Sequence, residues 1–101
     1  MGTYVQQVPV KFKTYTVTTA SPVYEDCQGF PYPITVTVIP SGSVQVFYST
    51  TPNAAGNSGT ATWISWPKGV VSVTTTDAVV SPIAALKFVA TTANAVVEVN
   101  A

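Results

Sequence analysis

Short segments in which apolar and polar side chains alternate recur along the chain at intervals of about ten residues. In one of them, Ile34, Val36 and Val38 fall on one face while Thr35 and Thr37 fall on the other. Successive side chains of a β-strand point to opposite faces, so this pattern predicts a strand with one buried face. No segment has the periodicity of an amphipathic helix. The pattern therefore predicts an all-β protein.

Proline, glycine and asparagine residues divide the chain into seven or eight expected strands. These cover residues 4–19 (one kinked edge strand, or two strands divided by Pro9), 34–39, 44–49, 60–66, 70–75, 83–90 and 95–99. A turn at 40–43 should join two of them as a hairpin, and 20–33, 50–59 and the region around Asp77 should be loops. Lys11 and Lys13 should mark the solvent face of the first strand, with Phe12 pointing inward, and Lys87 should mark the solvent face of 83–90. We expect a single β-sandwich domain over residues 1–101, with a jelly-roll rather than an immunoglobulin-like topology.

Two of the expected strands are apolar on both faces. Trp63 opposes Ile64 and Trp66 in one of them, and Phe47 opposes the valines of the other. A strand of this kind needs cover on both sides, whereas a two-layer sandwich covers only one. The second cover is either a loop of the same chain, such as 20–33, or another subunit. The side chains expected at such an interface are Phe30, Tyr32, Phe47, Ile64 and Trp66.

Charged residues make up only 8% of the chain, as four lysines, no arginine and four acids; an ordinary soluble domain has about 25%. Hydrophobic residues make up 47%, which argues against intrinsic disorder. The chain lacks the basic patch of a nucleic-acid binder and the apolar or cationic segment of a membrane binder. A surface so poor in charge favours burial against other subunits, and we expect a dimer or trimer.

The residues needed for most catalytic or metal sites are missing. There is no histidine, so the commonest general base and metal ligand are absent. Cys27 is the single cysteine, and the neighbouring acids Glu25 and Asp26 should raise its pKa. Two adjacent carboxylates could bind Ca²⁺ only together with further oxygen ligands, such as backbone carbonyls of the 24–33 segment. We therefore expect no catalytic residue, no metal and no cofactor.

The start of the chain is open to two interpretations. Residues 1–10 are low in charge and carry Tyr4, Val5 and Val8, and they have no features of a signal peptide. They form either the first edge strand of the sandwich or an arm that adds to the exposed sheet edge of a partner. Pro9 restricts the register of any such pairing because it has no N–H.

Three segments of the second half resemble small virion proteins of tailed bacteriophages: Val44–Pro52, Ala61–Gly69 and Ser81–Ala90. The shared features are a strand ending in Tyr-Ser-Thr, a Trp-x-x-Trp-Pro-x-Gly turn and a Pro-x-x-Ala-Leu-Lys strand, in which Lys87 stands where the family pattern has arginine. Such proteins include sandwich proteins that decorate or cement an assembled capsid and other head or tail accessory proteins. The resemblance therefore implies a virion accessory protein, and capsid decoration is the role we expect. It also implies the major capsid protein or another virion protein as partner, and a virion location after synthesis in the host cytoplasm.

A carbohydrate-binding module is the alternative function. Tyr24, Phe30 and Tyr32 lie in or near the loop 20–33, and Trp63 and Trp66 follow further along the chain. Aromatic rings exposed on a β-sandwich can stack on sugars. The same rings can equally fill a core or anchor an interface, where Trp and Tyr are enriched. Exposed coplanar rings would indicate sugar binding, whereas an apolar or threonine-rich patch would indicate decoration.

Overall fold

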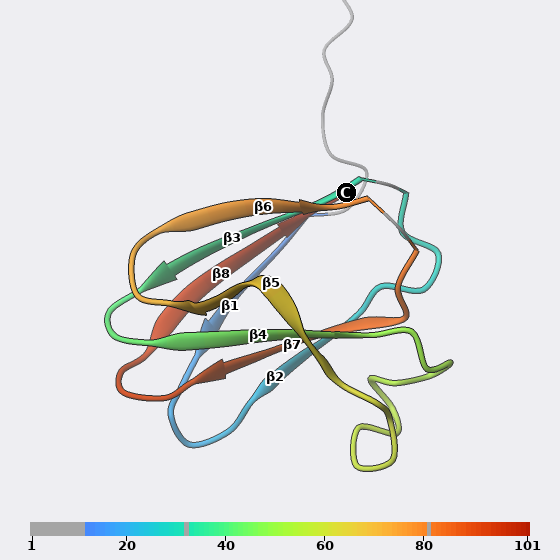
Figure 1. The fold of residues 1–101 in the computed structure, drawn as a ribbon, viewed down its shortest axis with the longest axis horizontal. Helices are drawn as coiled ribbons and strands as arrows, with labels where there is room; N and C mark the ends of the chain where they lie inside the picture. The colour runs from blue at the N-terminus through green and yellow to red at the C-terminus, as the bar shows by residue number, and fades with distance from the viewer. Residues whose placement is uncertain (1–11, 32, 81) are drawn as a thin grey trace, which may run out of the picture.

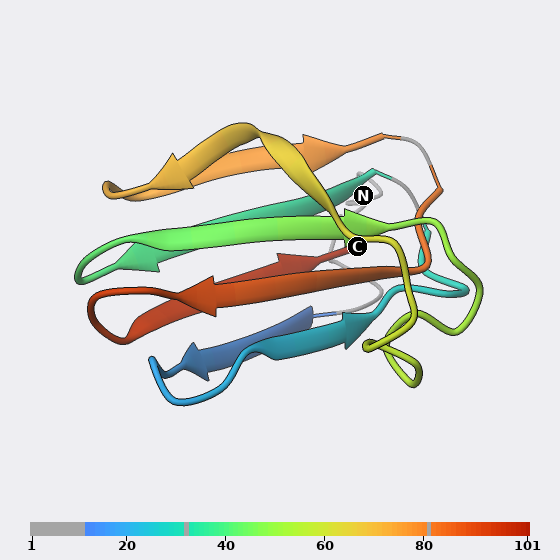
Figure 2. The ribbon, with the colours of Figure 1, turned by 60° about the horizontal axis from the view of Figure 1, so that its bottom comes forward.

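Two facing antiparallel sheets make up the computed structural model, which describes residues 12–31, 33–80 and 82–101 (Figures 1 and 2). Their strands are β1 (Phe12–Val17), β2 (Val23–Asp26), β3 (Ile34–Pro40), β4 (Val44–Ser49), β5 (Ile64–Val71), β6 (Thr75–Val79), β7 (Ala85–Ala90) and β8 (Ala95–Asn100). The strand orders are β1-β8-β3-β6 and β2-β7-β4-β5. The predicted all-β sandwich is confirmed. No helix in the described residues is long and apolar enough to span a membrane.

The strands pair in a regular nested pattern. β1 pairs with β8, β2 with β7, β3 with β6, and β4 with β5. The first four strands thus pair with the last four in reverse order. Most connections between consecutive strands cross from one sheet to the other (Figure 2). The predicted hairpin of 34–39 with 44–49 is wrong, because β3 and β4 lie in different sheets.

The core lies between the sheets and follows the alternation in the sequence. Its largest fully buried side chains are Phe88, Ile34 and Leu86, surrounded by valines from several strands. Burying each such side chain stabilises the fold by about 1.5–3 kcal/mol. Because these residues face inward, every second residue of the same strands faces outward, and the two outer faces of the sandwich are fixed by the same pattern.

The structure corrects two predicted connections. Residues 20–33 are not an uninterrupted loop, because β2 lies within them and pairs with β7 from Val23 opposite Phe88 to Asp26 opposite Ala85. The region around Asp77, expected to be a loop, contains β6. Both strands are short and only partly apolar, so the hydrophobic pattern of the sequence does not reveal them.

The predicted strands 60–66 and 70–75 are replaced by one irregular strand, β5. Its pairing with β4 shifts between Ser65, opposite Phe47, and Val70, opposite Gln45. The residues between form a bulge that contains Pro67, which has no N–H to donate, and Gly69, whose φ of 67° is in the left-handed region.

The predicted orientation of β1 is also wrong. Phe12 was expected to face inward, with Lys11 and Lys13 on the solvent face, but its side chain is 55% exposed. Val17 is buried and Tyr15 packs against the core, so the odd-numbered residues of β1 face inward. The reason is register: Val17 lies opposite Ala95 and Tyr15 opposite Val97, and both of these β8 residues are buried. Lys11 lies outside the described residues, as does the whole of 1–10.

Candidate functional site

The outer face of the β1-β8-β3-β6 sheet is nearly free of charge. Its central cross-strand row runs Thr14, Glu98, Thr37, Thr76 across the four strands. The rows on either side consist of Phe12, Asn100, Thr35 and Ala78, and of Thr16, Val96 and Ile39. We call these three rows the threonine face. The Thr37 and Thr76 hydroxyls lie 3.0 Å apart and hydrogen-bond across the strands.

Apolar side chains stand among the hydroxyls of the threonine face. Phe12, Ile39 and Val96 are 55%, 40% and 38% exposed. Glu98 is the single charged residue of the three rows. A face with one charged residue and this composition can bury apolar surface while its hydroxyls donate and accept hydrogen bonds, and so it suits contact with another protein.

The outer face of the other sheet carries an aromatic cluster around Lys87. In the strand register, Tyr24 and Phe47 lie directly on either side of Lys87. The Lys87 Nζ is 5.8 Å from the Tyr24 ring centroid, 5.3 Å from Phe47 and 5.7 Å from Trp63. These distances are typical of cation–π contacts. Lys87 was expected to mark a wet face, but its ammonium group lies among three rings and the residue is half-buried.

A loop of the same chain covers part of this outer face. Residues 50–63 fold into a series of turns that bury Ala54 against Ala84 and Ala85. Trp63 at its end donates from Nε1 to the Ser58 carbonyl at 3.0 Å. The strands that are apolar on both faces are therefore covered on their outer side partly by a loop of the same chain. This cover comes from 50–63 rather than from the 20–33 segment considered in the sequence.

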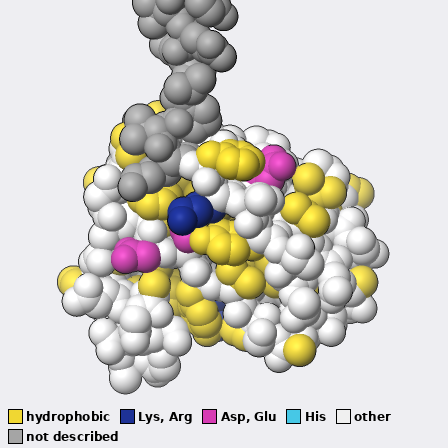
Figure 3. Space-filling model, turned by 180° about the vertical axis from the view of Figure 1, so that it is seen from behind, with side chains coloured by type: hydrophobic (Ala, Val, Ile, Leu, Met, Phe, Trp, Pro, Cys, Tyr) yellow, Lys and Arg dark blue, Asp and Glu magenta, His cyan; other side chains and the backbone are white. Residues whose placement is uncertain are grey.

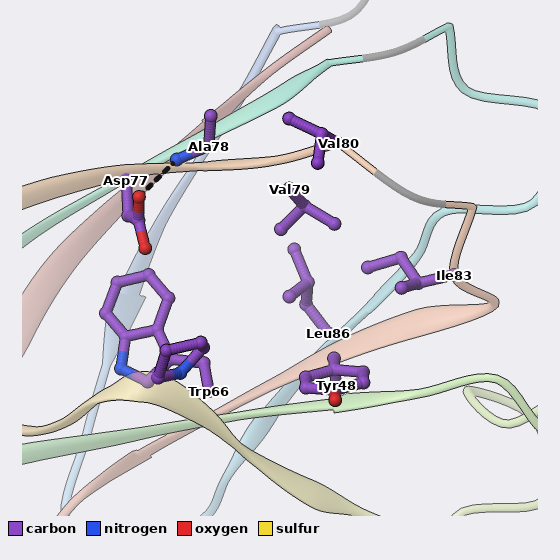
Figure 4. Close-up of a pocket in the computed structure, with 9 residues that line it drawn as sticks. Tyr48, Trp66, Asp77, Ala78, Val79, Val80, Ile83 and Leu86 are labelled. Carbon is purple, nitrogen blue, oxygen red and sulfur yellow. Dashed lines mark hydrogen bonds between the residues drawn. The ribbon is translucent and has the colours of Figure 1, made fainter.

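A pocket of about 210 Å³ opens between the sheets, on the side where β5 and β6 form the sheet edges (Figure 4). Its lining comes from β4, β5, β6, β7 and the segment before β7, and includes Tyr48, Trp66, Asp77, Val79, Ile83 and Leu86. The pocket is mainly apolar, and Asp77 is the charged residue of its lining. Asp77 Oδ1 accepts the Ala78 N–H at 2.9 Å, and Trp66 Nε1 donates to the Gly69 carbonyl at 3.1 Å.

The opposite side of the sandwich, between β1 and β2, is closed by a polar contact. The Tyr15 hydroxyl donates to Glu25 Oε2, while Glu25 Oε1 is buried and has no hydrogen-bond partner among the described residues. Burial, with the Glu25 hydrogen bond and charge, raises the pKa of Tyr15. Burial, with the Glu25 and Asp26 charges, raises the pKa of Cys27 to about 12. A thiol held neutral in this way is a poor nucleophile.

The side chains expected at an interface do not form one surface. Phe47 belongs to the aromatic cluster, Ile64 is 43% exposed at the β5 edge, and Phe30 packs against the core. Trp66 is only 4% exposed, so it has almost no surface to offer a partner; the bulge of β5 directs its ring into the space between the sheets (Figure 4). Tyr32 lies outside the described residues, as do Tyr4, Val5 and Val8 of the expected arm.

Charged side chains are sparse on the surface. On the face shown in Figure 3, blue and magenta groups are few, and hydrophobic and uncharged polar groups make up most of the coloured and white surface. Among the described residues, no group of three or more His, Cys, Asp or Glu side chains is arranged to hold a metal ion. The features that remain as candidate sites are thus the threonine face, the aromatic cluster and the β5–β6 pocket.

Comparison with known proteins gave no match to a family model, a curated protein or a solved structure.

Proposed function

We propose that this protein is a non-enzymatic accessory protein of a tailed-phage virion, which binds the assembled capsid shell through the threonine face. The face itself is the observation that carries the proposal. Interface cores are depleted in charged residues, and exposed apolar patches mark interaction sites. Three rows spanning a whole sheet with a single charge, Glu98, have this character.

The strand order gives further support and favours a jelly roll over an immunoglobulin-like fold. In the nested pairing, the first strand meets the last and the two middle strands form a hairpin. This is the arrangement of a ribbon rolled into two sheets, and jelly rolls are common among viral capsid proteins, although lectins share them. The resemblance of residues 44–90 to small virion proteins points in the same direction. The partner would be the major capsid protein or another virion protein.

The test is co-sedimentation with shells assembled from the major capsid protein encoded in the same genome. Ile39→Lys and Val96→Lys place a charge on the threonine face, and each should weaken shell binding by about tenfold or more, since an unpaired charge at an interface is costly. Val70→Lys is the matched control, because Val70 is 58% exposed but pairs with Gln45 on the other sheet. Wild-type binding by both face variants would refute the proposal.

Carbohydrate binding is the second candidate, favoured by the aromatic cluster. The Tyr24 and Trp63 rings have centroids 5.5 Å apart but are tilted by 47°, so these two rings do not form a coplanar platform. Titration of tryptophan fluorescence with a panel of oligosaccharides separates the two functions. A saturable change that is lost in Trp63→Phe would favour sugar binding, and no change would leave capsid binding as the better explanation.

A further inference from the structure

The β5–β6 side of the sandwich combines a pocket with exposed apolar side chains. Ile64 lies opposite the pocket residue Tyr48, and Val80 lines the pocket itself. Val73 lies in the connection between β5 and β6. Ile64, Val73 and Val80 are 43%, 71% and 74% exposed. An opening into the core that is flanked by exposed apolar side chains suits an inserted side chain of a binding partner.

β6 is an edge strand, and a strand that joined its outer side would replace the bond between the Ala78 N–H and the Asp77 carboxylate. β6 pairs with β3, and in the described residues no strand lies on its other side. The Ala78 N–H donates to the carboxylate of Asp77, so it is not used in the ladder with β3. Because ladder groups alternate along an antiparallel strand, the backbone groups of Thr76 should also point toward the free edge.

The other sheet edges are protected in ways that β6 is not. β2 has only four residues, β5 is broken by a bulge with Pro67 and Lys68, and β1 carries Lys13. Short strands, bulges, prolines and lysines all discourage strand addition. β6 has no bulge, proline or lysine; it is five residues long, and its one charged residue, Asp77, lies on the pocket side. It is therefore the edge best suited to accept a further strand.

The first eleven residues of the chain have the chemistry to fill this site. They contain Tyr4, Val5, Val8 and Val10, and their charged side chain is Lys11. An extended segment of this length reaches about 36 Å. The pocket is larger than a cavity of about 150 Å³ that admits benzene, so it can take an aliphatic or aromatic side chain. Lys11 would complement Asp77.

Residues 1–11 would pair more easily with β6 of a second copy than with β6 of their own chain. Phe12 lies in the same cross-strand row as Ala78, but at the opposite edge of the sheet. A segment pairing antiparallel with its own β6 would end near Thr75, leaving few residues to return across the sheet to Phe12. A neighbouring copy imposes no such limit.

We propose that residues 1–11 of one copy add as a fifth strand to β6 of a second copy, with an apolar side chain in the pocket and Lys11 beside Asp77. Donor and acceptor are different surfaces, so the contact is head-to-tail and closes into a ring or continues as a chain. This inference does not rest on the proposed capsid function, because it concerns only contacts between copies of this chain.

Disulfide trapping tests the contact directly. In a Cys27→Ala background, chains carrying Val5→Cys, Val8→Cys or Val10→Cys are each mixed with chains carrying Val80→Cys and oxidised. At least one mixture should give a disulfide-linked heterodimer on a denaturing gel. Thr19→Cys, another exposed position, replaces Val80→Cys as the matched control. Cross-linking no stronger than this control in all three mixtures would overturn the proposal.

Charge reversal supplies an independent readout by light scattering over a concentration series. Deletion of residues 1–10, Lys11→Glu and Asp77→Lys should each raise the self-dissociation constant by about tenfold or more. The double variant Lys11→Glu/Asp77→Lys should recover most of the wild-type association. Undiminished association after the deletion, no recovery in the double variant, or a strictly monomeric wild type at about 100 μM would each contradict the proposed pairing.

Discussion

Two side chains with titratable groups are buried in and directly after β2. They are the carboxylate of Glu25 and the thiol of Cys27. Glu25 is 6% exposed, with one oxygen bonded to the Tyr15 hydroxyl and the other without a partner. Among the described residues it makes no ion pair, so its negative charge would be buried without a compensating cation. Burying an uncompensated charge is costly, so Glu25 should reduce the stability of the folded state.

Replacing the carboxyl group of Glu25 by an amide should stabilise the protein. Glu25→Gln keeps an oxygen that accepts the Tyr15 hydroxyl but removes the charge, so the free energy of unfolding at pH 7 should rise by about 1 kcal/mol. Glu25→Ala leaves the hydroxyl without its acceptor and should lower that free energy by about 1–3 kcal/mol. Urea unfolding measures both variants. Destabilisation of Glu25→Gln as large as that of Glu25→Ala would show that the charge itself is needed.

The raised pKa of Cys27 predicts a loss of stability in alkali. The folded thiol titrates near 12 and an ordinary thiol near 9, so the folded state binds its proton more tightly. The resulting stabilisation is complete below pH 9 and is lost as the pH rises from 9 to 12. The free energy of unfolding of Cys27→Ala, measured with urea between pH 8 and 11, should fall less steeply than that of the wild type. Parallel curves would contradict the prediction.

At the scale of the elements, β5 shows how local residues shape a site. Pro67 and Gly69 make the bulge between Ser65 and Val70, and this bulge lets the Trp66 ring enter the space between the sheets while Lys68 remains exposed. The Trp66 indole is held there by its hydrogen bond to the Gly69 carbonyl. The pocket beside β6 thus depends on a backbone irregularity.

Gly69→Ala should therefore destabilise the protein through its backbone alone. A Cβ at this position meets nothing within 4 Å, but φ is 67°, a conformation that costs a non-glycine residue about 1–2 kcal/mol. Gly59→Ala is the matched control, because it also has open space and no positive φ. Thermal unfolding should show a lower melting temperature for Gly69→Ala only. Equal melting temperatures would mean that the bulge relaxes without cost.

The long, regularly alternating strands could be predicted from the sequence. β3, β4, β7 and β8 lie close to their expected bounds because valines or other apolar residues occupy every second position. β2 and β6 were missed because they are short and because their inward positions include Glu25 and Asp77. Which face of β1 points inward depends on its register with β8. The alternation of side chains within β1 does not determine that register.

The candidate sites were harder to predict because they depend on strand order. The opposition of Trp63 to Ile64 and Trp66 was visible in the sequence. The threonine face was not, since Thr14, Thr37 and Thr76 become neighbours only when β1, β8, β3 and β6 pair in that order. The aromatic cluster likewise needs β2 and β4 on either side of β7, which brings Tyr24 and Phe47 to Lys87.

The whole molecule presents two unlike faces and two unlike sides. One face is rich in threonine and carries a single charged residue in its three rows, and the other carries aromatic rings partly covered by the 50–63 loop. One side is closed by Tyr15 and Glu25, and the other opens into the β5–β6 pocket. This asymmetry would allow one face to bind a shell while the open side contacts another copy.

A chelator should leave the stability of the whole domain unchanged. The described residues contain no cluster of metal ligands, and a structural metal would contribute to the folding free energy directly. The melting temperature with excess EDTA should therefore lie within about 1 °C of the value without it, well below the several degrees that a loss of 1 kcal/mol would cause. A drop of several degrees would reveal a metal site that involves residues outside the described set.

The orientation of the protein on a capsid shell tests the proposed function most directly. Cryo-electron microscopy of shells with and without added protein would give a difference map into which the sandwich can be placed. The proposal predicts density on the shell in which the β1-β8-β3-β6 sheet faces the capsid subunits, with Ile39 and Val96 at the contact. Absence of added density, or density in which the Tyr24, Phe47 and Trp63 face contacts the shell instead, would contradict it.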